Sequence, residues 1–268
     1  MGRCEAAGNP SAVSIPPSHR LDADCLPLVY PLRVHIHLYA ALRKLLCALH
    51  LGERRSFWVI LVTMTTQTRI YLASQSSRRR ELLRQIGINF EMLLLRFDIC
   101  RNIDVEETIR PGEQPEEYVQ RLCQAKVKAG CDALRLRNLA VFPVLAADTD
   151  VALDGRILGK PENPEQAAAM LRQLSGREHH VHSAVAIALG EHIEMALSTS
   201  TVRFAKLSED RIRRYLLTHE FADKAGGYAI QGQAGAFIEH ISGSYSGVMG
   251  LHLFETVQLL QRFDYPTP

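Results

Sequence analysis

Apolar positions along the chain follow recognisable strand and helix periods from Arg69 onward. The pattern predicts strands over residues 69–73, 141–147, 179–189 and 193–204, and helices over residues 77–86, 113–134, 164–174, 208–218 and 247–263. Asp154-Gly155 is typical of a hairpin turn, and the glycine-rich residues 226–238 favour an extended stretch. Because strands and helices are interspersed without strict βαβ alternation, the sequence predicts an α/β fold with a mixed sheet.

The first sixty-odd residues have a different character. Residues 1–31 are rich in Pro, Ser, Ala and Gly and are expected to be disordered, while residues 34–51 could form an amphipathic helix. A membrane-surface role for that helix is not favoured, since only Arg43 and Lys44 stand on its polar side. Met64 stands just ahead of the first convincing strand. We therefore predict a domain over residues 64–268 and a poorly structured extension over residues 1–63, which could be a start-site artefact and which intact-mass measurement would test.

Composition narrows the functional classes without choosing one. The chain has 268 residues, of which 47% are hydrophobic and 22% charged, as is ordinary for a globular protein in water. A net charge of +2 gives no reason to expect a nucleic-acid partner. Six cysteines are scattered without a CxxC pair, which indicates reduced thiols. No apolar run approaches the roughly 20 residues of a membrane span, and no secretory signal is evident, so the expected compartment is the cytoplasm.

The segment "LASQSSRRRELL" combines a strand, a small-residue turn and a helix start. Such a start presents free backbone N–H groups and about half a positive charge. Arg78, Arg79 and Arg80 add three more cations at this end. The arginines are either solvated on an exposed turn or gathered around an anion, and the serine-rich turn with Ser74 favours a phosphate site.

Two further segments carry charged groups beside predicted strands and helices. In "AADTD", Asp148 and Asp150 would share one face if the preceding strand continued, where carboxylates can hold Mg²⁺ or accept a proton from water. A polar turn is the alternative. In "GKPENPEQ", Lys160 stands between Gly159 and Pro161 just before a helix, where a lysine can reach a phosphate.

Another segment, "DKAGGYAIQG", is dense in glycine, which suggests tight turns or close approach of the backbone to a ligand. Gln231 in this segment has an amide that can read the edge of a base, because it offers both donors and an acceptor. Of His179, His180 and His182, the last two could share one face of a strand, but no third ligand has zinc-site spacing, so we do not expect a metal there.

Taken together, these segments resemble the Maf family of nucleoside triphosphate pyrophosphatases. The motifs that carry the resemblance are "LASQSSRRRELL", "AADTDVALDGRILGKP", "AAAMLRQLSGREHHVHSAV", "DKAGGYAIQG" and "GSYSGVMGLHLFET", in that order from about residue 69 to residue 260. The resemblance implies an elongated, mixed-sheet, two-lobed fold with a central cleft, similar to that of inosine triphosphatase-like enzymes. It also implies hydrolysis of a nucleoside triphosphate to the monophosphate and pyrophosphate with a divalent cation such as Mg²⁺, Mn²⁺ or Co²⁺. Homodimers are plausible for this family.

The family's functional residues carry over by motif. Asp148 matches the proton acceptor, and Ser74, Arg79, Lys126 and Lys160 match phosphate-contacting positions. Glu107, in "VEET", matches an acidic position and would hold the metal together with Asp148. Arg80 is expected to be solvated.

The expected substrates follow from three specificity positions. Arg78, Thr149 and Gln231 match the subgroup that acts on dTTP and UTP, and such an enzyme could also clear non-standard nucleotides. Two alternatives stay open: a pyrophosphatase of the 7-methyl-GTP type, and a non-catalytic nucleotide-binding regulator of septum formation. Ser77 and His252 replace prolines of the family pattern, which bears on rate or stability more than on activity.

Overall fold

The computed structural model describes residues 69–95 and 105–267, and the expectations for residues 1–63 lie outside this part of the chain. In the described part the elements are, in chain order, β1 (Ile70–Leu72), α3 (Ser77–Gln85), β2 (Phe90–Met92), α4 (Pro115–Leu136), β3 (Val144–Leu153), β4 (Arg156–Ile157), α5 (Pro164–Leu174), β5 (Glu178–Leu189), β6 (His192–Phe204), α6 (Glu209–Leu216), the 3₁₀ turns η1 (Ala225–Gly227) and η2 (Gln233–Phe237), β7 (Ile238–Ser242), α7 (Tyr245–Met249) and α8 (Leu253–Arg262). No helix in this part is long and apolar enough to cross a membrane.

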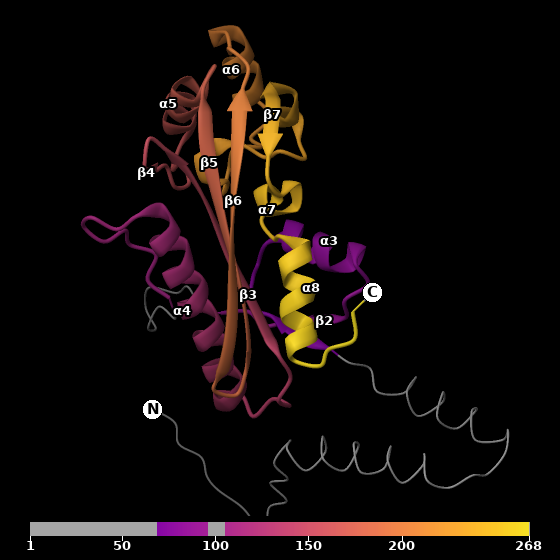
Figure 1. The fold of residues 1–268 in the computed structure, drawn as a ribbon. Coiled ribbons are helices and arrows are strands. Elements are labelled where there is room, and N and C mark those ends of the chain that lie inside the picture. The colour runs from indigo at the N-terminus through magenta and orange to yellow at the C-terminus, as the bar shows by residue number, and fades with distance from the viewer. Residues whose placement is uncertain (1–68, 96–104, 268) are drawn as a thin grey trace, which may run out of the picture. The chain divides into compact units, whose positions relative to one another are not determined.

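The strands form one seven-stranded sheet with the order β2-β1-β3-β5-β6-β7, and β4 pairs with the end of β3. β1 is parallel to both β2 and β3, whereas all other pairs are antiparallel. The predicted α/β fold with a mixed sheet is therefore confirmed. The long strands β3, β5 and β6 run through the domain, and the shorter elements gather around their two halves (Figure 1).

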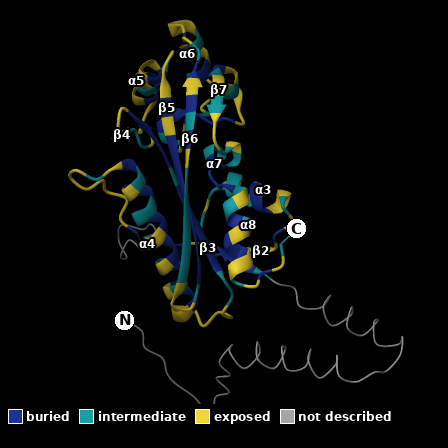
Figure 2. Cartoon of the chain, viewed as in Figure 1, coloured by how far each residue is buried: buried dark blue, intermediate teal, exposed yellow. Residues whose placement is uncertain are grey.

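Helices cover the two halves of the sheet differently, which gives the domain two lobes. In the first lobe, α4 packs on one face of the sheet, while α3 and α8 pack on the other. In the second lobe, α5, α6 and the two 3₁₀ turns bury the far ends of β3, β5 and β6. The central strand β3 is buried along nearly its whole length, as Figure 2 shows. This strand thus connects two separately packed cores.

β3 has an open edge between the lobes, and this edge positions the polar motif. On the side away from β5, β3 pairs with β1 at Val144 and Leu145 and with β4 at Ala152 and Leu153. Residues 146–150 pair only with β5 among the described strands. The alternation of the strand continues through this gap. It places Asp148 on the α4 face, with Ala146, and Thr149 on the α3 face, with Ala147.

Local signals explain why most helices begin where the pattern predicts. α4 starts with Pro115 and a capping box between Gln114 and Glu117. α5 starts with Pro164, and the Asn163 side chain accepts a hydrogen bond from the backbone N–H of Gln166 at 2.8 Å.

Three predictions of local structure are wrong. The strand predicted to end at residue 147 continues to Leu153, because Asp148, Thr149 and Asp150 find tertiary partners or burial within the sheet. The stretch over residues 226–238 is not extended but contains two 3₁₀ turns. The helix predicted over residues 247–263 is two helices, because Gly250 has a φ of 125° that ends α7.

Candidate active site

A cavity of about 560 Å³ lies at the open edge of β3, between the two lobes. All the side chains predicted from the sequence to act on a nucleotide line it: Ser74, Arg78, Arg79, Glu107, Lys126, Asp148, Thr149, Lys160 and Gln231. They come from the β1–α3 turn, the first turn of α3, the loop before α4, α4 itself, β3, the segment after β4 and the turn before η2. The fold therefore brings together residues that are up to 157 positions apart in the sequence, Ser74 and Gln231 (231 − 74 = 157).

The first wall of the cavity is the start of α3. Ser76 is the N-cap residue, and its hydroxyl accepts a hydrogen bond from the backbone N–H of Arg79 at 3.5 Å. The Ser74 hydroxyl accepts one from the backbone N–H of Ser76 at 3.2 Å. The two serines thus hold the turn so that the positive end of the helix faces the cavity.

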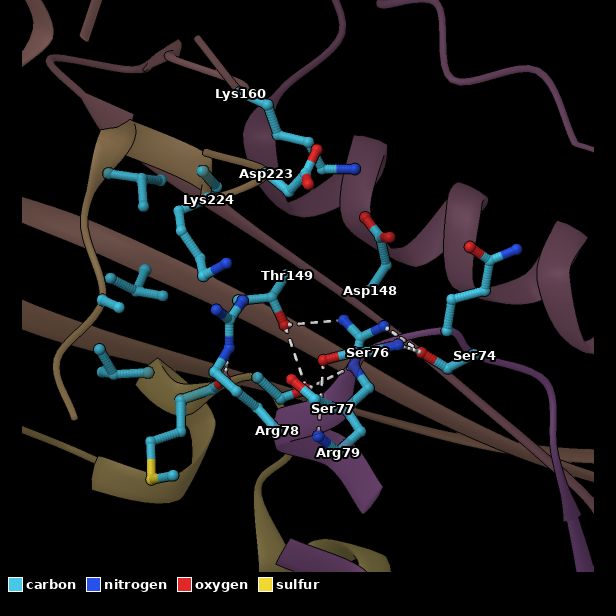
Figure 3. Close-up of a pocket in the computed structure, with 18 of the residues that line it drawn as sticks. Ser74, Ser76, Ser77, Arg78, Arg79, Asp148, Thr149, Lys160, Asp223 and Lys224 are labelled. Atoms are coloured by element: carbon cyan, nitrogen blue, oxygen red, sulfur yellow. Dashed lines mark hydrogen bonds between the residues drawn. The ribbon is translucent and has the colours of Figure 1, made fainter. Parts of the chain in front are cut away.

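Arg79 is partly buried in this wall, and its hydrogen bonds go to neutral groups. Its Nε donates to the carbonyl of Gly250 at 2.8 Å, and its terminal nitrogens donate to the hydroxyls of Ser74 at 3.1 Å and Thr149 at 3.4 Å (Figure 3). These bonds use three of the five guanidinium N–H groups. Burial lowers the pKa of Arg79, and the carboxylates of Asp148 and Glu107 oppose that shift. A partly buried cation without a directly bonded carboxylate is well suited to an anionic ligand.

The other two arginines of this helix start, Arg78 and Arg80, lie in different surroundings. The Nε of Arg78 donates to the carbonyl of Met249 at 3.1 Å, which leaves its terminal nitrogens at the cavity (Figure 3). Arg80, expected to be solvated, is half-buried, and its Nε is inaccessible to water and has no hydrogen-bond partner in the described part of the chain. The expectation that Arg80 is solvated is therefore wrong.

The opposite wall carries a lysine between two carboxylates. The ammonium of Lys126, from α4, lies 2.5 Å from Oδ1 of Asp148 and 2.7 Å from Oε1 of Glu107. Lys126 and Asp148 are each only 8% exposed. Burial alone would lower the pKa of Lys126, but Asp148 and Glu107 outweigh it and raise the pKa. Burial alone would raise the pKa of Glu107, but Lys126, and more weakly Lys160, lower it.

Lys160 and Gln231 reach the cavity from the second lobe. The ammonium of Lys160 is 3.7 Å from Oε2 of Glu107 and remains more than half exposed. Gln231 is exposed at the rim, in the turn that precedes η2. The Gln231 turn is fixed by Glu220, whose Oε2 accepts a hydrogen bond from the backbone N–H of Gln233 at 2.9 Å.

Asp150 and the three histidines do not line this cavity. Asp150 is 4% exposed, and burial raises its pKa to about 7. His179 is also buried, and its Nε2 lies 2.8 Å from the hydroxyl of Tyr228. His252, one of the two replaced prolines, is fully buried as the N-cap residue of α8.

Two charged residues of the cavity were missed by the sequence analysis. Asp223 and Lys224 line it from the segment just before η1 (Figure 3). They open the motif "DKAGGYAIQG", in which only Gln231 was given a role. The motif itself was the available signal, but a lysine in a loop has no periodicity that would show which way its side chain points.

Comparisons with known proteins give consistent results for this domain. The sequence model of the family described as Maf-like protein matches residues 69–263. A relative from Aromatoleum aromaticum, named dTTP/UTP pyrophosphatase, is 54% identical over 201 residues, which cover 75% of this chain and 98% of the relative. A relative of the same name from Nitrosospira multiformis is 55% identical over 195 residues, which cover 73% of this chain and 94% of the relative.

Among solved structures, the Ham1 protein of Staphylococcus aureus matches 73% of this chain and 97% of its own. The two are 18% identical and have a TM-score of 0.39. At that score the likeness adds nothing to what the relatives indicate.

Proposed function

Because the chain belongs to the Maf family, we propose that it is a nucleoside triphosphate pyrophosphatase that hydrolyses dTTP and UTP to the monophosphate and pyrophosphate. The observation that carries this proposal is the convergence of all nine sequence-predicted side chains on one cavity. The two relatives described above, which are 54% and 55% identical to this chain, are named dTTP/UTP pyrophosphatase. The cavity volume, about 560 Å³, is in the range of small-molecule sites.

Cations on both sides of the cavity suit a triphosphate, which carries about four negative charges that cations can neutralise. Arg79 and the start of α3 would bind phosphate oxygens from one lobe, and Lys160 would bind them from the other. Thr149 is fixed by Arg79 and by the Ser183 hydroxyl, 3.0 Å away, and with Arg78 and Gln231 it would contact the base.

Asp148 is the proposed proton acceptor. A water between Asp148 and the α-phosphorus would lose a proton to the carboxylate as its oxygen bonds to the α-phosphorus. The bond from the α-phosphorus to the bridging oxygen would break, and pyrophosphate would leave with that oxygen. Lys126 holds Asp148 in place through the 2.5 Å hydrogen bond, which fixes the carboxylate relative to the phosphates. Lys126, Arg79 and Lys160 would then stabilise the charge that builds up on the leaving group.

A divalent cation fits the donors present. The carboxylates of Glu107 and Asp148 both contact the Lys126 ammonium and so lie close to each other, and no cluster of three His, Cys, Asp or Glu side chains exists in the described residues that could hold a metal alone. Two carboxylates completed by phosphate oxygens and water are typical of Mg²⁺ sites on nucleotides. When bound, the ion would neutralise phosphate charge as a Lewis acid.

We further propose that the enzyme acts in the cytoplasm, that it forms a homodimer and that its substrate is a small-molecule nucleotide.

A nucleotide panel assayed for pyrophosphate release tests this function on the full chain. We expect dTTP and UTP to be cleaved in preference to the other nucleotides in the presence of Mg²⁺, Mn²⁺ or Co²⁺. Faster cleavage of 7-methyl-GTP would favour the related enzyme class instead. Tight binding of dTTP with no cleavage under any metal would favour a non-catalytic regulator.

A further inference from the structure

Lys224 is a cation of the cavity that the proposed mechanism does not use. Its ammonium donates to the carbonyl of Ala222 at 3.0 Å, two residues back in its own segment. In the described part of the chain no carboxylate oxygen lies within ion-pair distance of it. The side chain is half-buried, and Figure 3 shows it pointing across the cavity toward Arg78.

Charged groups of both signs surround this amine, and together with burial their net effect disfavours its charged form. Burial lowers the pKa of Lys224, and Arg78 and Lys160 lower it further. Asp223 and Glu220 oppose the shift, but neither makes a close contact with the ammonium. Lys224 and Arg78 are half-buried cations, and neither has an ion pair in the described part of the chain, so they repel each other and lose part of their hydration. The arrangement has a clear cost for the free protein.

The backbone around Lys224 prevents this strain from relaxing. The N–H of Gly226 donates to the carbonyl of Gly159 at 2.8 Å, so the Lys224 segment is tied to the segment that carries Lys160. Gly226 has a φ of 67°, and a Cβ atom there would meet the Val151 side chain at 3.0 Å. Asp223 also has a positive φ, of 58°. A positive φ is uncommon for a residue other than glycine, and such conformations cluster at functional sites, where a side chain must be held in position.

We propose that Lys224 is a phosphate-binding residue that acts together with Lys160 on the phosphate chain of the substrate. The two lysines form one unit of the second lobe, because the Gly159–Gly226 hydrogen bond fixes their spacing. They face Arg78 and Arg79 of the first lobe, so a polyphosphate between the lobes would be bound from both sides. This inference rests on the proposed function for the identity of the ligand, but the anion site itself can be tested without catalysis.

The test compares Lys224→Met with wild type by calorimetric titration, using inorganic tripolyphosphate and a non-hydrolysable α,β-imido analogue of dTTP. We expect both ligands to bind about tenfold to a hundredfold more weakly, the usual effect of losing a hydrogen bond to a charged group. Lys206→Met is the matched control, since Lys206 is exposed and does not line the cavity. Lys224→Arg keeps the charge and should recover part of the affinity.

The melting temperature is a second readout, because Lys224→Met should lower it if Lys224 had only a structural role. Removing a repelled cation should leave the melting temperature of Lys224→Met unchanged or higher.

Unchanged tripolyphosphate affinity in a folded Lys224→Met protein would overturn the inference, even if wild type cleaves dTTP. An altered preference between dTTP and dCTP with unchanged tripolyphosphate affinity would also overturn it, because Lys224 would then read the base. Loss of tripolyphosphate binding in the variant, with no dTTP cleavage by wild type, would retain the anion site and reject the proposed function. If Lys224→Met does not fold, Lys224→Gln takes its place under the same criteria.

Discussion

The lysine between two carboxylates makes a quantitative prediction about stability. In Lys126→Met, Asp148 and Glu107 lose the cation that lies 2.5 Å and 2.7 Å from them. Removing one partner of a buried ion pair costs about 3–5 kcal/mol, because the remaining charge stays buried. The Glu107 side chain is 37% exposed, so water screens part of the loss and the lower limit applies. We expect a destabilisation of about 3 kcal/mol, which for a domain of this size lowers Tm by about 6–12 °C.

Scanning calorimetry of the full chain at pH 7 measures this shift, with Lys160→Met as the matched control. Lys160 is 3.7 Å from the same glutamate, but its side chain is 57% exposed, so its loss should cost less than about 1 kcal/mol. A Tm of Lys126→Met within the range of the Lys160→Met variant would refute the reasoning, because the buried pair would then contribute no more than a surface pair.

The pH dependence of this prediction has a defined sign. The pKa of Glu107 is lowered in the folded state, so its contribution to stability is present above its ordinary pKa and is lost as the pH falls. The pKa of Lys126 is raised, so its contribution is complete below its ordinary pKa and is lost only as the pH rises through the raised value. The deficit of Lys126→Met should therefore be constant near neutral pH and begin to shrink below about pH 4.5, where this glutamate takes up a proton in the unfolded chain before it does so in the folded wild type.

Three further predictions concern catalysis, pH and the specificity turn. Asp148→Asn should reduce pyrophosphate release from dTTP by about a hundredfold to ten-thousandfold, as expected when a general base is removed. Asp154→Asn, an exposed change outside the cavity, should be near wild type, and equal rates for the two variants would reject Asp148 as the base. Burial lowers the pKa of His179 to about 4, so the unfolded chain binds a proton between about pH 6.5 and 4 that the folded domain does not. Wild-type stability should fall by about 2 kcal/mol from pH 7 to pH 5 through this residue, and urea titration should find that part of the fall missing in His179→Gln. Gly232→Ala would place a Cβ atom 2.1 Å from Oε1 of Glu220, so the carboxylate must move and lose its hydrogen bond to the backbone N–H of Gln233. Steady-state kinetics should then show a higher KM for dTTP. An unchanged KM would mean that this contact does not position Gln231.

Much of the fold could be predicted from sequence because its signals are local. α5 occupies the predicted residues 164–174, since Asn163 and Pro164 begin it and the apolar stripe continues through it. The predicted Asp154-Gly155 turn has positive φ at both residues, as a two-residue hairpin requires. The extension of β3 through Asp148–Asp150 could not be predicted in this way. Its polar residues are stabilised by Lys126 and Arg79, which lie far away in the sequence.

The candidate site shows the same division. Motif matching identified nine side chains of the cavity, and the structure shows them lining one space. Lys224 and the Glu220 contact that fixes the Gln231 turn were missed, because their positions depend on strained loop conformations. The half-buried state of Arg80 was missed for a related reason, since the exposure of a first-turn residue depends on what packs beside the helix.

The open edge of β3 has a mechanical consequence. Because β3, β5 and β6 are the strands that run through both lobes, their right-handed twist sets the angle at which Arg79 on one side faces Lys160 on the other. A substitution deep in the sheet that changes this twist would alter the span available to a ligand without touching any residue that binds it. The distance between the cations of the two lobes, and so the length of ligand that they can bind together, therefore depends on how rigidly these three strands keep their twist.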